Sequence, residues 1–250
     1  MLLKILGSGT CVISLKRSSP ANYLKIGGKQ LLVDCGPGTL MQLEKAGLHY
    51  KDIDIVFITH YHIDHISDLD ALIWVYKWGG LKRKKDLIIV GPVGFANFYN
   101  TYIKPLVWET PAESFDVIIK EIENKIDFTT FAVECCKTEH TDESVAYKFI
   151  ENENSLVISG DTDFSEDLIK LAQGCNVLML ECSFENSMKV NGHLTPKECG
   201  FIAKRAGVEK LILTHLYPAS PEIIRLNEAK EIFVNTILAE DLMEIEISKL

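Results

Sequence analysis

The sequence lacks an apolar run that could cross a membrane, and it lacks a surplus of positive charge. None of its apolar stretches approaches the roughly 20 residues needed to span a bilayer, and Gly7 interrupts the N-terminal apolar segment too early for a signal peptide. The net charge of −9 argues against broad nucleic-acid binding, which usually depends on an excess of Lys and Arg. These absences predict a cytoplasmic protein that does not interact with membranes.

C-x-x-C pairs and low-complexity segments are absent as well. The seven cysteines are odd in number and no secretory signal accompanies them, so we expect buried, reduced thiols. No linker divides the 250 residues, of which 47% are hydrophobic and 24% are charged, as in an ordinary globular protein. We therefore predict one domain that spans residues 1–250.

The stretch from Thr59 to His65 is unusually rich in metal-binding side chains. His60 and His62 are two residues apart, so an extended backbone points both imidazoles to the same side. Asp64 and His65 follow, where a turn directs them to a second point in space. The alternative is a polar loop whose histidines only titrate near neutral pH. Because the whole chain has only seven histidines, three within six positions favour two adjacent metal ions.

Further candidate ligands lie in short loops after apolar β-strand patterns. His140, Asp161 and His215 each follow such a pattern, and His193 lies in the loop Asn191–Thr195. Any one of them alone is more often an ordinary loop residue, so the argument depends on their recurrence. His49 falls outside this pattern and is predicted to be a surface histidine.

The hydrophobic pattern predicts two sheets packed face to face with helices outside. Ile53 to Ile58 is apolar throughout, as expected for a strand covered on both faces. Ser67 to Trp78 reads as a helix. Thr195 to Ala206 reads as another, with Pro196 at its first position and Glu198 completing a capping box.

In these motifs and their order, the chain resembles the metallo-β-lactamase superfamily across nearly its whole length. The resemblance implies an α+β fold, the αββα four-layer sandwich, with two metal ions at its edge. It implies that His60, His62 and His140 bind one metal, that Asp64, His65 and His215 bind the other, and that Asp161 bridges both. Two divalent ions are implied, most readily Zn²⁺, with Mn²⁺ and Fe²⁺ as alternatives. They would activate water for hydrolysis by lowering its pKa. Asp34, Asp68 and Glu139 are candidates for carboxylates that orient the ligand histidines.

Within the superfamily, the chain looks like the ribonuclease Z group of phosphodiesterases. The similarity includes Gly7–Thr10, Asp34–Thr39 and Ser159–Thr162. His193 resembles the histidine of the group's H-x-T loop, which acts on the leaving oxygen, and Glu181–Phe184 resembles its H-E-A-T-F loop. Asp161 stands where true β-lactamases use a cysteine, so antibiotic hydrolysis is disfavoured. The expected function is a phosphodiesterase in which Asp64 orients the nucleophile and His193 assists the leaving group.

Three departures put tRNA maturation in doubt. His140 and Asp161 are only 21 positions apart (161 − 140). This segment is too short for the arm with which ribonuclease Z grips tRNA. Of the group's P-x-K-x-R-N loop only Arg17 fits, and the overall charge is acidic. A small molecule or a short nucleic acid is therefore the expected substrate. The run Lys82–Lys85 is either a solvated loop or a patch that attracts phosphate.

Two other functions remain open from the sequence. One is hydrolysis of a carboxyl ester, lactone or thioester on the same metals. The other is a non-hydrolytic di-iron redox module, although that form usually carries a flavin-binding domain for which 250 residues leave no space. Trp74 and Trp78, four residues apart on the predicted helix, favour core packing or a homodimer interface.

Overall fold

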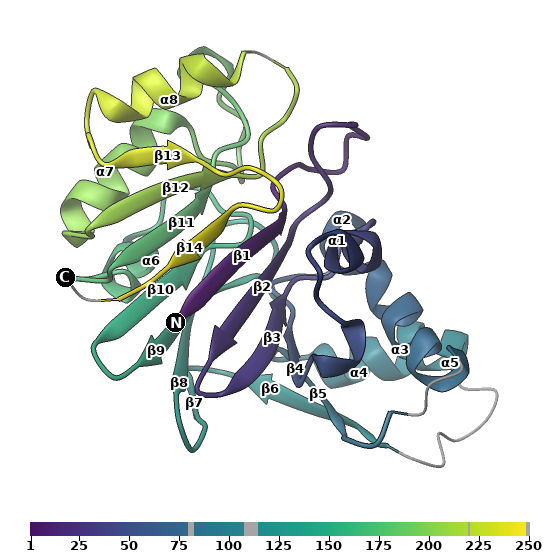
Figure 1. Ribbon diagram of the computed structural model, residues 1–250. Coiled ribbons are helices and arrows are strands. Elements are labelled where there is room, and N and C mark those ends of the chain that lie inside the picture. Colours follow the sequence, from purple (N-terminus) through teal and green to yellow (C-terminus); the bar gives the residue numbers. More distant parts are fainter. Residues whose placement is uncertain (80–82, 108–114, 220, 249–250) are drawn as a thin grey trace.

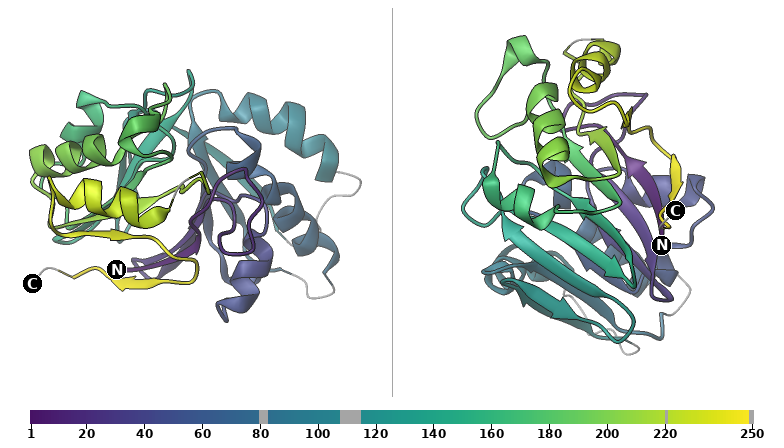
Figure 2. Two further views of the ribbon diagram at one scale, coloured as in Figure 1. Left: turned by 90° about the horizontal axis from the view of Figure 1, so that it is seen from above. Right: turned by 90° about the vertical axis from the view of Figure 1, so that its left-hand side faces the viewer.

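The computed structural model describes residues 1–79, 83–107, 115–219 and 221–248. Two seven-stranded sheets face each other, and helices cover their outer faces (Figure 1, Figure 2). This is the αββα sandwich that the motifs predicted. Strands β1 and β14 pair antiparallel, so the two ends of the described chain lie side by side.

The first sheet contains the N-terminal half of the chain and one C-terminal strand. Strands β3, β4, β5 and β6 run parallel, with β6 at the edge, whereas β14, β1 and β2 are antiparallel to their neighbours. In spatial order the strands are β14 (Glu244–Glu246), β1 (Leu2–Gly7), β2 (Ala21–Ile26), β3 (Lys29–Val33), β4 (Ile55–Phe57), β5 (Leu87–Pro92) and β6 (Val117–Ile122).

The second sheet is built from the C-terminal half. Strands β10 to β13 run parallel, and β7 to β9 form an antiparallel meander beside them. In spatial order they are β13 (Thr236–Leu238), β12 (Lys210–Thr214), β11 (Val177–Glu181), β10 (Asn154–Ile158), β9 (Val145–Glu151), β8 (Ala132–Lys137) and β7 (Lys125–Asp127).

Helices lie against the outer face of each sheet (Figure 2). The first sheet carries α1 (Thr39–Lys45), η1 (Tyr50–Asp52), α2 (Ile63–Ile66), α3 (Asp68–Trp78), α4 (Phe95–Phe98), the π-helix η2 (Tyr99–Ile103) and α5 (Lys104–Val107). The second carries α6 (Glu166–Leu171), η3 (Asn186–Met188), α7 (Pro196–Ala206) and α8 (Glu222–Lys230). Helix α7 begins with the predicted capping box: Thr195 caps the helix, and the Glu198 carboxylate accepts hydrogen bonds from the Thr195 N–H and hydroxyl.

Alternating side chains on apolar strands divide the interior into three cores. In β4, Ile55 and Phe57 face the core between the sheets, whereas Val56 faces the helices. A third core lies between the second sheet and α6, α7 and α8. Because both faces of the parallel strands are buried, these strands read as continuous apolar runs in the sequence. Polar groups are therefore concentrated in the loops at the strand ends.

The seven cysteines, all within the described residues, form no disulfide bond. Among the described helices, none is both long and apolar enough to span a bilayer.

Arg17 anchors the N-terminal loop inside the protein. Its side chain is only 5% exposed and forms two hydrogen bonds to the Glu222 carboxylate, at 2.8 and 2.9 Å, and a third to the Ala239 carbonyl. These contacts fix residues 8–18 against α8. In the sequence, Arg17 is the one residue that fits the P-x-K-x-R-N loop of the ribonuclease Z group, and the structure shows that its guanidinium is occupied by internal partners.

This anchor predicts a pH-dependent contribution to stability. The hydrogen bonds from Arg17, with those from Lys16, lower the pKa of Glu222 from 4.5 to about 2. A carboxylate whose pKa is lower in the folded protein than in the unfolded chain stabilises the fold at pH values above the unfolded-state pKa. This stabilisation is lost as the pH falls from 4.5 towards 2. Because Glu222 is partly exposed, we expect Glu222→Gln to cost about 1 kcal/mol at pH 7. The free energy of unfolding can be measured with urea on metal-free protein. The difference in this free energy between Glu222→Gln and wild type should be smaller at pH 3 than at pH 7. An equal difference at pH 3 and pH 7 would contradict the prediction.

Candidate metal centre

Loops from both sheets meet at one edge of the sandwich and bring seven polar side chains together. His60 and His62 follow β4, and Asp64 and His65 lie on the short helix α2. The other three come from the second sheet, His140 after β8, Asp161 after β10 and His215 after β12. All three of these strands point the same way, so their carboxyl ends share an edge. Side chains up to 155 residues apart in sequence (215 − 60) thus form one site.

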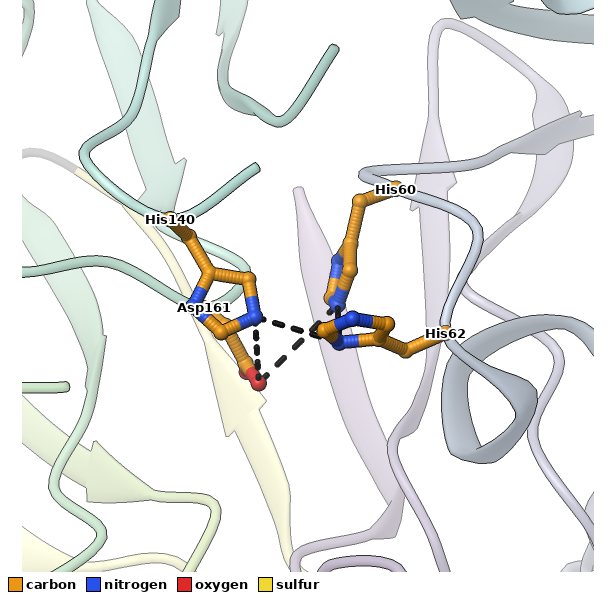
Figure 3. A group of neighbouring side chains, drawn as sticks. All are labelled: His60, His62, His140 and Asp161. Carbon is orange, nitrogen blue, oxygen red and sulfur yellow. Dashed lines mark hydrogen bonds and ion pairs between the residues drawn. The ribbon is translucent and has the colours of Figure 1, made fainter. Parts of the chain in front are cut away.

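Three histidines and Asp161 form the first candidate metal-binding group, shown in Figure 3. The Nδ1 atom of His62 lies 3.0 Å from His60 Nε2 and 3.1 Å from His140 Nε2. Oδ2 of Asp161 lies 3.9 Å from His60 Nε2 and 3.8 Å from His140 Nε2. The ring nitrogens and the carboxylate oxygen therefore point at a common centre.

Asp64, His65 and His215 form the second group. Oδ2 of Asp64 lies 3.5 Å from His215 Nε2 and 3.9 Å from His65 Nε2. Oδ1 of Asp161 lies 3.3 Å from His65 Nε2 and 3.5 Å from His215 Nε2. One carboxylate oxygen of Asp161 thus belongs to each group, which is the arrangement of a bridging ligand.

The residues present fit two divalent metal ions. Zinc–nitrogen bonds of about 2.0–2.1 Å in tetrahedral geometry place neighbouring ligand atoms about 3.3 Å apart, close to the spacings in both groups. Three buried atoms at the centre have no hydrogen-bond partner among the described residues: His65 Nε2, His215 Nε2 and Asp161 Oδ1. Unpartnered buried polar atoms are costly. Their convergence is explained if a cation satisfies them.

The electrostatics of the site favour the metal-binding protonation states of His60 and Asp161. Burial, followed by the neighbouring His65, lowers the pKa of His60 well below its usual value. Burial raises the pKa of Asp161, but the surrounding His215, His65 and His60 outweigh it and hold that pKa well below its usual range. Neutral imidazoles and an ionised bridging carboxylate are the forms that coordinate metals.

Asp34 orients one of the ligand histidines. Its Oδ2 lies 2.8 Å from His65 Nδ1, and its Oδ1 accepts a 2.8 Å hydrogen bond from the Thr59 N–H. The Asp34 backbone has φ 61°, a left-handed conformation that directs the carboxylate back towards the site. Of the three carboxylates proposed from the sequence, Asp34 is the one that the structure places on a ligand histidine. Asp68 instead accepts from the Leu40 N–H, and Glu139 is exposed.

Asp34→Asn is expected to weaken metal binding about 10- to 100-fold, because it changes the hydrogen bond that fixes the His65 ring. Asn tolerates the left-handed backbone at this position, so the substitution should change the orientation of the His65 ring without disturbing the fold. Metal affinity can be measured by competition with a chromophoric chelator. Asp68→Asn is the matched control and should bind metal as the wild type does. Equal affinities of Asp34→Asn and wild type would remove Asp34 from the centre.

His193 lies beside the centre and is held by Glu181. Its Nδ1 donates a 2.8 Å hydrogen bond to Glu181 Oε1 and lies 4.0 Å from Asp161 Oδ2. Burial lowers the pKa of His193, but the Glu181 carboxylate outweighs burial and raises it above its usual value. The other Glu181 oxygen accepts from the Ser183 hydroxyl, whose oxygen lies 2.9 Å from His215 Nδ1. Glu181 and Ser183 therefore link His193 to a metal ligand.

In the sequence, Glu181–Phe184 matched the H-E-A-T-F loop, but no role was assigned to Glu181 or Ser183. Glu181 ends an apolar strand and is only 1% exposed. A carboxylate at the end of a fully buried strand was the available signal, the same one that identified Asp161.

Contacts of Lys189 hold the loop that carries His193 in place. Lys189 Nζ donates to the His193 carbonyl at 2.7 Å and forms ion pairs with Asp163 and Glu198. The Gly192 carbonyl lies 2.9 Å from His140 Nδ1, so the same loop also orients a ligand. Fixing this loop fixes both histidines.

Two sequence expectations concern surfaces away from this edge. His49 is exposed, as predicted. In the run Lys82–Lys85, Lys82 lies outside the described residues. Arg83 is 2% exposed and donates to the Lys51, Ile53 and Asp86 carbonyls at the opposite ends of β4 and β5. Its guanidinium is therefore not directed at the metal centre.

Comparisons with known proteins agree with this fold. The family model described as "Anti-Pycsar protein Apyc1" matches residues 1–236. The chain is 28% identical to a ribonuclease Z of Archaeoglobus fulgidus, with 99% of each chain covered. Human tRNase Z, short form (ELAC1), has a TM-score of 0.82 and 25% identity, with all of both chains covered. The metallo-β-lactamase fold protein YhfI from Bacillus subtilis has a TM-score of 0.86 at 23% identity, covering 98% of this chain and 99% of YhfI. The predicted resemblance to ribonuclease Z and the metallo-β-lactamase fold is thereby confirmed.

Proposed function

The chain belongs to the family of the anti-Pycsar protein Apyc1, and on this premise we propose that it is a two-metal phosphodiesterase that acts on small phosphodiesters. It is a metal-dependent hydrolase related to ribonuclease Z. The observation that carries the proposal is Asp161, whose two oxygens belong to two ligand groups beside His193. Two metals spaced by one carboxylate suit the attacking and leaving oxygens of a phosphoryl transfer.

The residues that would hold the metals are His60, His62 and His140 on one side, and Asp64, His65 and His215 on the other, with Asp161 between them. Metals bound there would supply a water of lowered pKa and neutralise charge on the phosphoryl oxygens. Oδ2 of Asp64 lies 3.5 Å from His215 Nε2 and faces the centre, so its carboxylate can orient the attacking water. The chain itself thus fixes the direction of attack.

His193 is the general acid of the proposed mechanism. The Glu181 hydrogen bond at Nδ1 fixes the ring and raises the pKa of His193, which favours the protonated form that a general acid needs. Donation of this proton neutralises the alkoxide that leaves phosphorus. Ser183 and Lys189 keep the ring and its loop in place during the transfer.

The proposed substrate is small because the described residues between His140 and Asp161 contain no extended arm of the kind with which ribonuclease Z grips tRNA. The alignment with the Archaeoglobus fulgidus ribonuclease Z extends over 311 positions, so at least 61 of them face gaps in this 250-residue chain (311 − 250). Between His140 and Asp161 the chain contains only β9 and β10, joined by a tight hairpin. Beside the centre, Phe184 and Tyr217 stack at 4.8 Å and present an aromatic face to the organic part of a diester, such as the base of a cyclic nucleotide.

The second candidate is hydrolysis of a carboxyl ester, lactone or thioester on the same metals. His193 favours the phosphodiester, because an alkoxide leaving from phosphorus needs a proton more than a thiolate does. The test is a panel of bis(p-nitrophenyl) phosphate, cyclic nucleotides, lactones, glutathione thioesters and a precursor tRNA. Turnover of the diesters without processing of the tRNA supports the proposal. Turnover of a lactone or thioester without any diester overturns it.

Three finer properties complete the proposal. Zinc is the proposed native metal, because imidazole-rich, four-coordinate groups suit it, and elemental analysis of purified protein tests this. The protein is proposed to be one cytoplasmic domain. Trp74 and Trp78, 41% and 54% exposed on α3, are proposed to bury their rings between two copies of the chain. Sedimentation of a Trp78→Glu variant, expected to shift from dimer to monomer, tests that interface.

A further inference from the structure

His215 binds the second metal from a strained backbone. Its φ is 55°, in the left-handed region that side chains other than glycine rarely adopt. Such a conformation costs free energy and persists only where neighbouring contacts enforce it. Its Nε2 reaches both Asp64 and Asp161 from this backbone, so relaxation of the strain would withdraw the ligand.

Backbone hydrogen bonds hold the residues on either side of His215. The Cys182 N–H donates to the Thr214 carbonyl at 2.8 Å, and the Leu216 N–H donates to the Ser8 carbonyl at 3.1 Å. These bonds join the loop after β12 to the loop after β11 and to the N-terminal loop. These two bonds do not restrain the backbone after Leu216.

Arg225 supplies that contact from α8. It is fully buried, at 0% exposure, and its Nη2 donates to the Tyr217 carbonyl at 2.8 Å. Its Nη1 donates to the Ser183 carbonyl, also at 2.8 Å. Ser183 is the residue whose hydroxyl oxygen lies 2.9 Å from His215 Nδ1. One guanidinium therefore ties the backbone two residues after His215 to the residue that contacts its ring.

We propose that Arg225 is a positioning residue for the second metal, because it keeps His215 in its strained, metal-binding conformation. The planar fork of an arginine can hold two carbonyls at a fixed separation, which a lysine cannot do. The inference rests on the two-metal centre of the proposed function and adds a residue outside the ligand set. It makes a specific claim: loss of Arg225 weakens the group of Asp64, His65 and His215, and spares the group of His60, His62 and His140.

Arg83 provides a matched control within the same chain. It is also buried, at 2% exposure, and also donates to backbone carbonyls, but these lie at the edge opposite the metal centre. Removing either guanidinium leaves carbonyls without their donors and should lower stability. Only Arg225 should change the binding of a metal. The comparison separates positioning from a general contribution to folding.

The experiment is a stepwise zinc titration of the full-length, metal-free protein, with the two dissociation constants obtained by competition with a chromophoric chelator. His215→Ala identifies the step that belongs to the second group. Arg225→Met should raise that dissociation constant at least tenfold and leave the other within twofold of wild type. Arg225→Lys, which keeps the charge and can bind only one carbonyl well, should fall in between. Arg83→Met should leave both constants unchanged.

Two results would overturn the inference. One is an Arg225→Lys or Arg225→Met protein whose two zinc dissociation constants equal those of wild type, when circular dichroism shows that the protein is folded. The other is a loss of both metals together that Arg83→Met reproduces, since the arginine would then serve folding alone. The readout needs no substrate. A wild type that binds two ions but cleaves no diester would refute the proposed function and leave this inference standing.

Discussion

Replacing Asp161 with Asn is expected to lower kcat/KM for a phosphodiester about a thousandfold or more, because several kcal/mol of transition-state stabilisation depend on the metals that it holds. Its two oxygens belong to two ligand groups, so one substitution disturbs both. Asn also removes the negative charge that balances the cluster of His215, His65 and His60. Metal content by elemental analysis should fall below two ions per chain.

The control for this variant is Asp167→Asn on α6. Asp167 forms an exposed ion pair with Lys170 and lies outside both ligand groups. It should retain two metals and wild-type activity. An Asp161→Asn enzyme that still held two ions and turned over diester at the wild-type rate would contradict a bridging role for Asp161.

Replacing His193 with Ala is expected to lower kcat by about 10²- to 10⁴-fold, the usual contribution of a general acid. The side chain lies beside Asp161 but belongs to the hydrogen-bond pair with Glu181, so metal content should remain at two. The two variants thus fail differently: Asp161→Asn loses metal and rate, whereas His193→Ala loses rate alone. Diester turnover and elemental analysis of the same samples distinguish them.

The reactivity of the leaving group sharpens the His193 test. A diester that releases p-nitrophenolate needs little proton donation, so His193→Ala should be much less impaired with it than with a diester that releases an alkoxide. His49→Ala serves as control, because His49 is exposed and belongs to none of the ligand groups. Equal losses with both leaving groups would assign His193 to substrate binding, and no loss with either would remove it from the mechanism.

The sequence was informative where a polar residue follows an apolar strand. His60, His140, Asp161 and His215 each interrupt a pattern that the hydrophobic core explains, so their chemistry stands out. The fold brings them together because parallel strands end at a shared edge. Glu181 follows the same rule, but it is the last residue of its strand and lacks a neighbouring histidine in the sequence. Its contact with His193 is set by the loop of residues 182–193 and could be seen only in the structure.

Other features depend on backbone geometry and burial that sequence patterns do not encode. Asp34 and Asp68 look equivalent in the sequence, and only the left-handed backbone of Asp34 turns its carboxylate to His65. Arg83 belongs to a run that the sequence left open as a solvated loop or a phosphate-attracting patch, and Arg17 fits a motif of the ribonuclease Z group. Both are buried and hydrogen-bonded to the protein itself. Arg225 carried no sequence signal, because an arginine on an amphipathic helix is ordinarily a surface residue.

The most direct test of the two-metal phosphodiesterase is the recovery of activity as zinc is returned to metal-free protein. Hydrolysis of bis(p-nitrophenyl) phosphate would be followed against the number of zinc equivalents added per chain. The two ligand groups and the shared Asp161 predict no turnover without metal and full turnover when the second equivalent is bound. Full turnover by metal-free protein, or a plateau at one equivalent, would contradict the account.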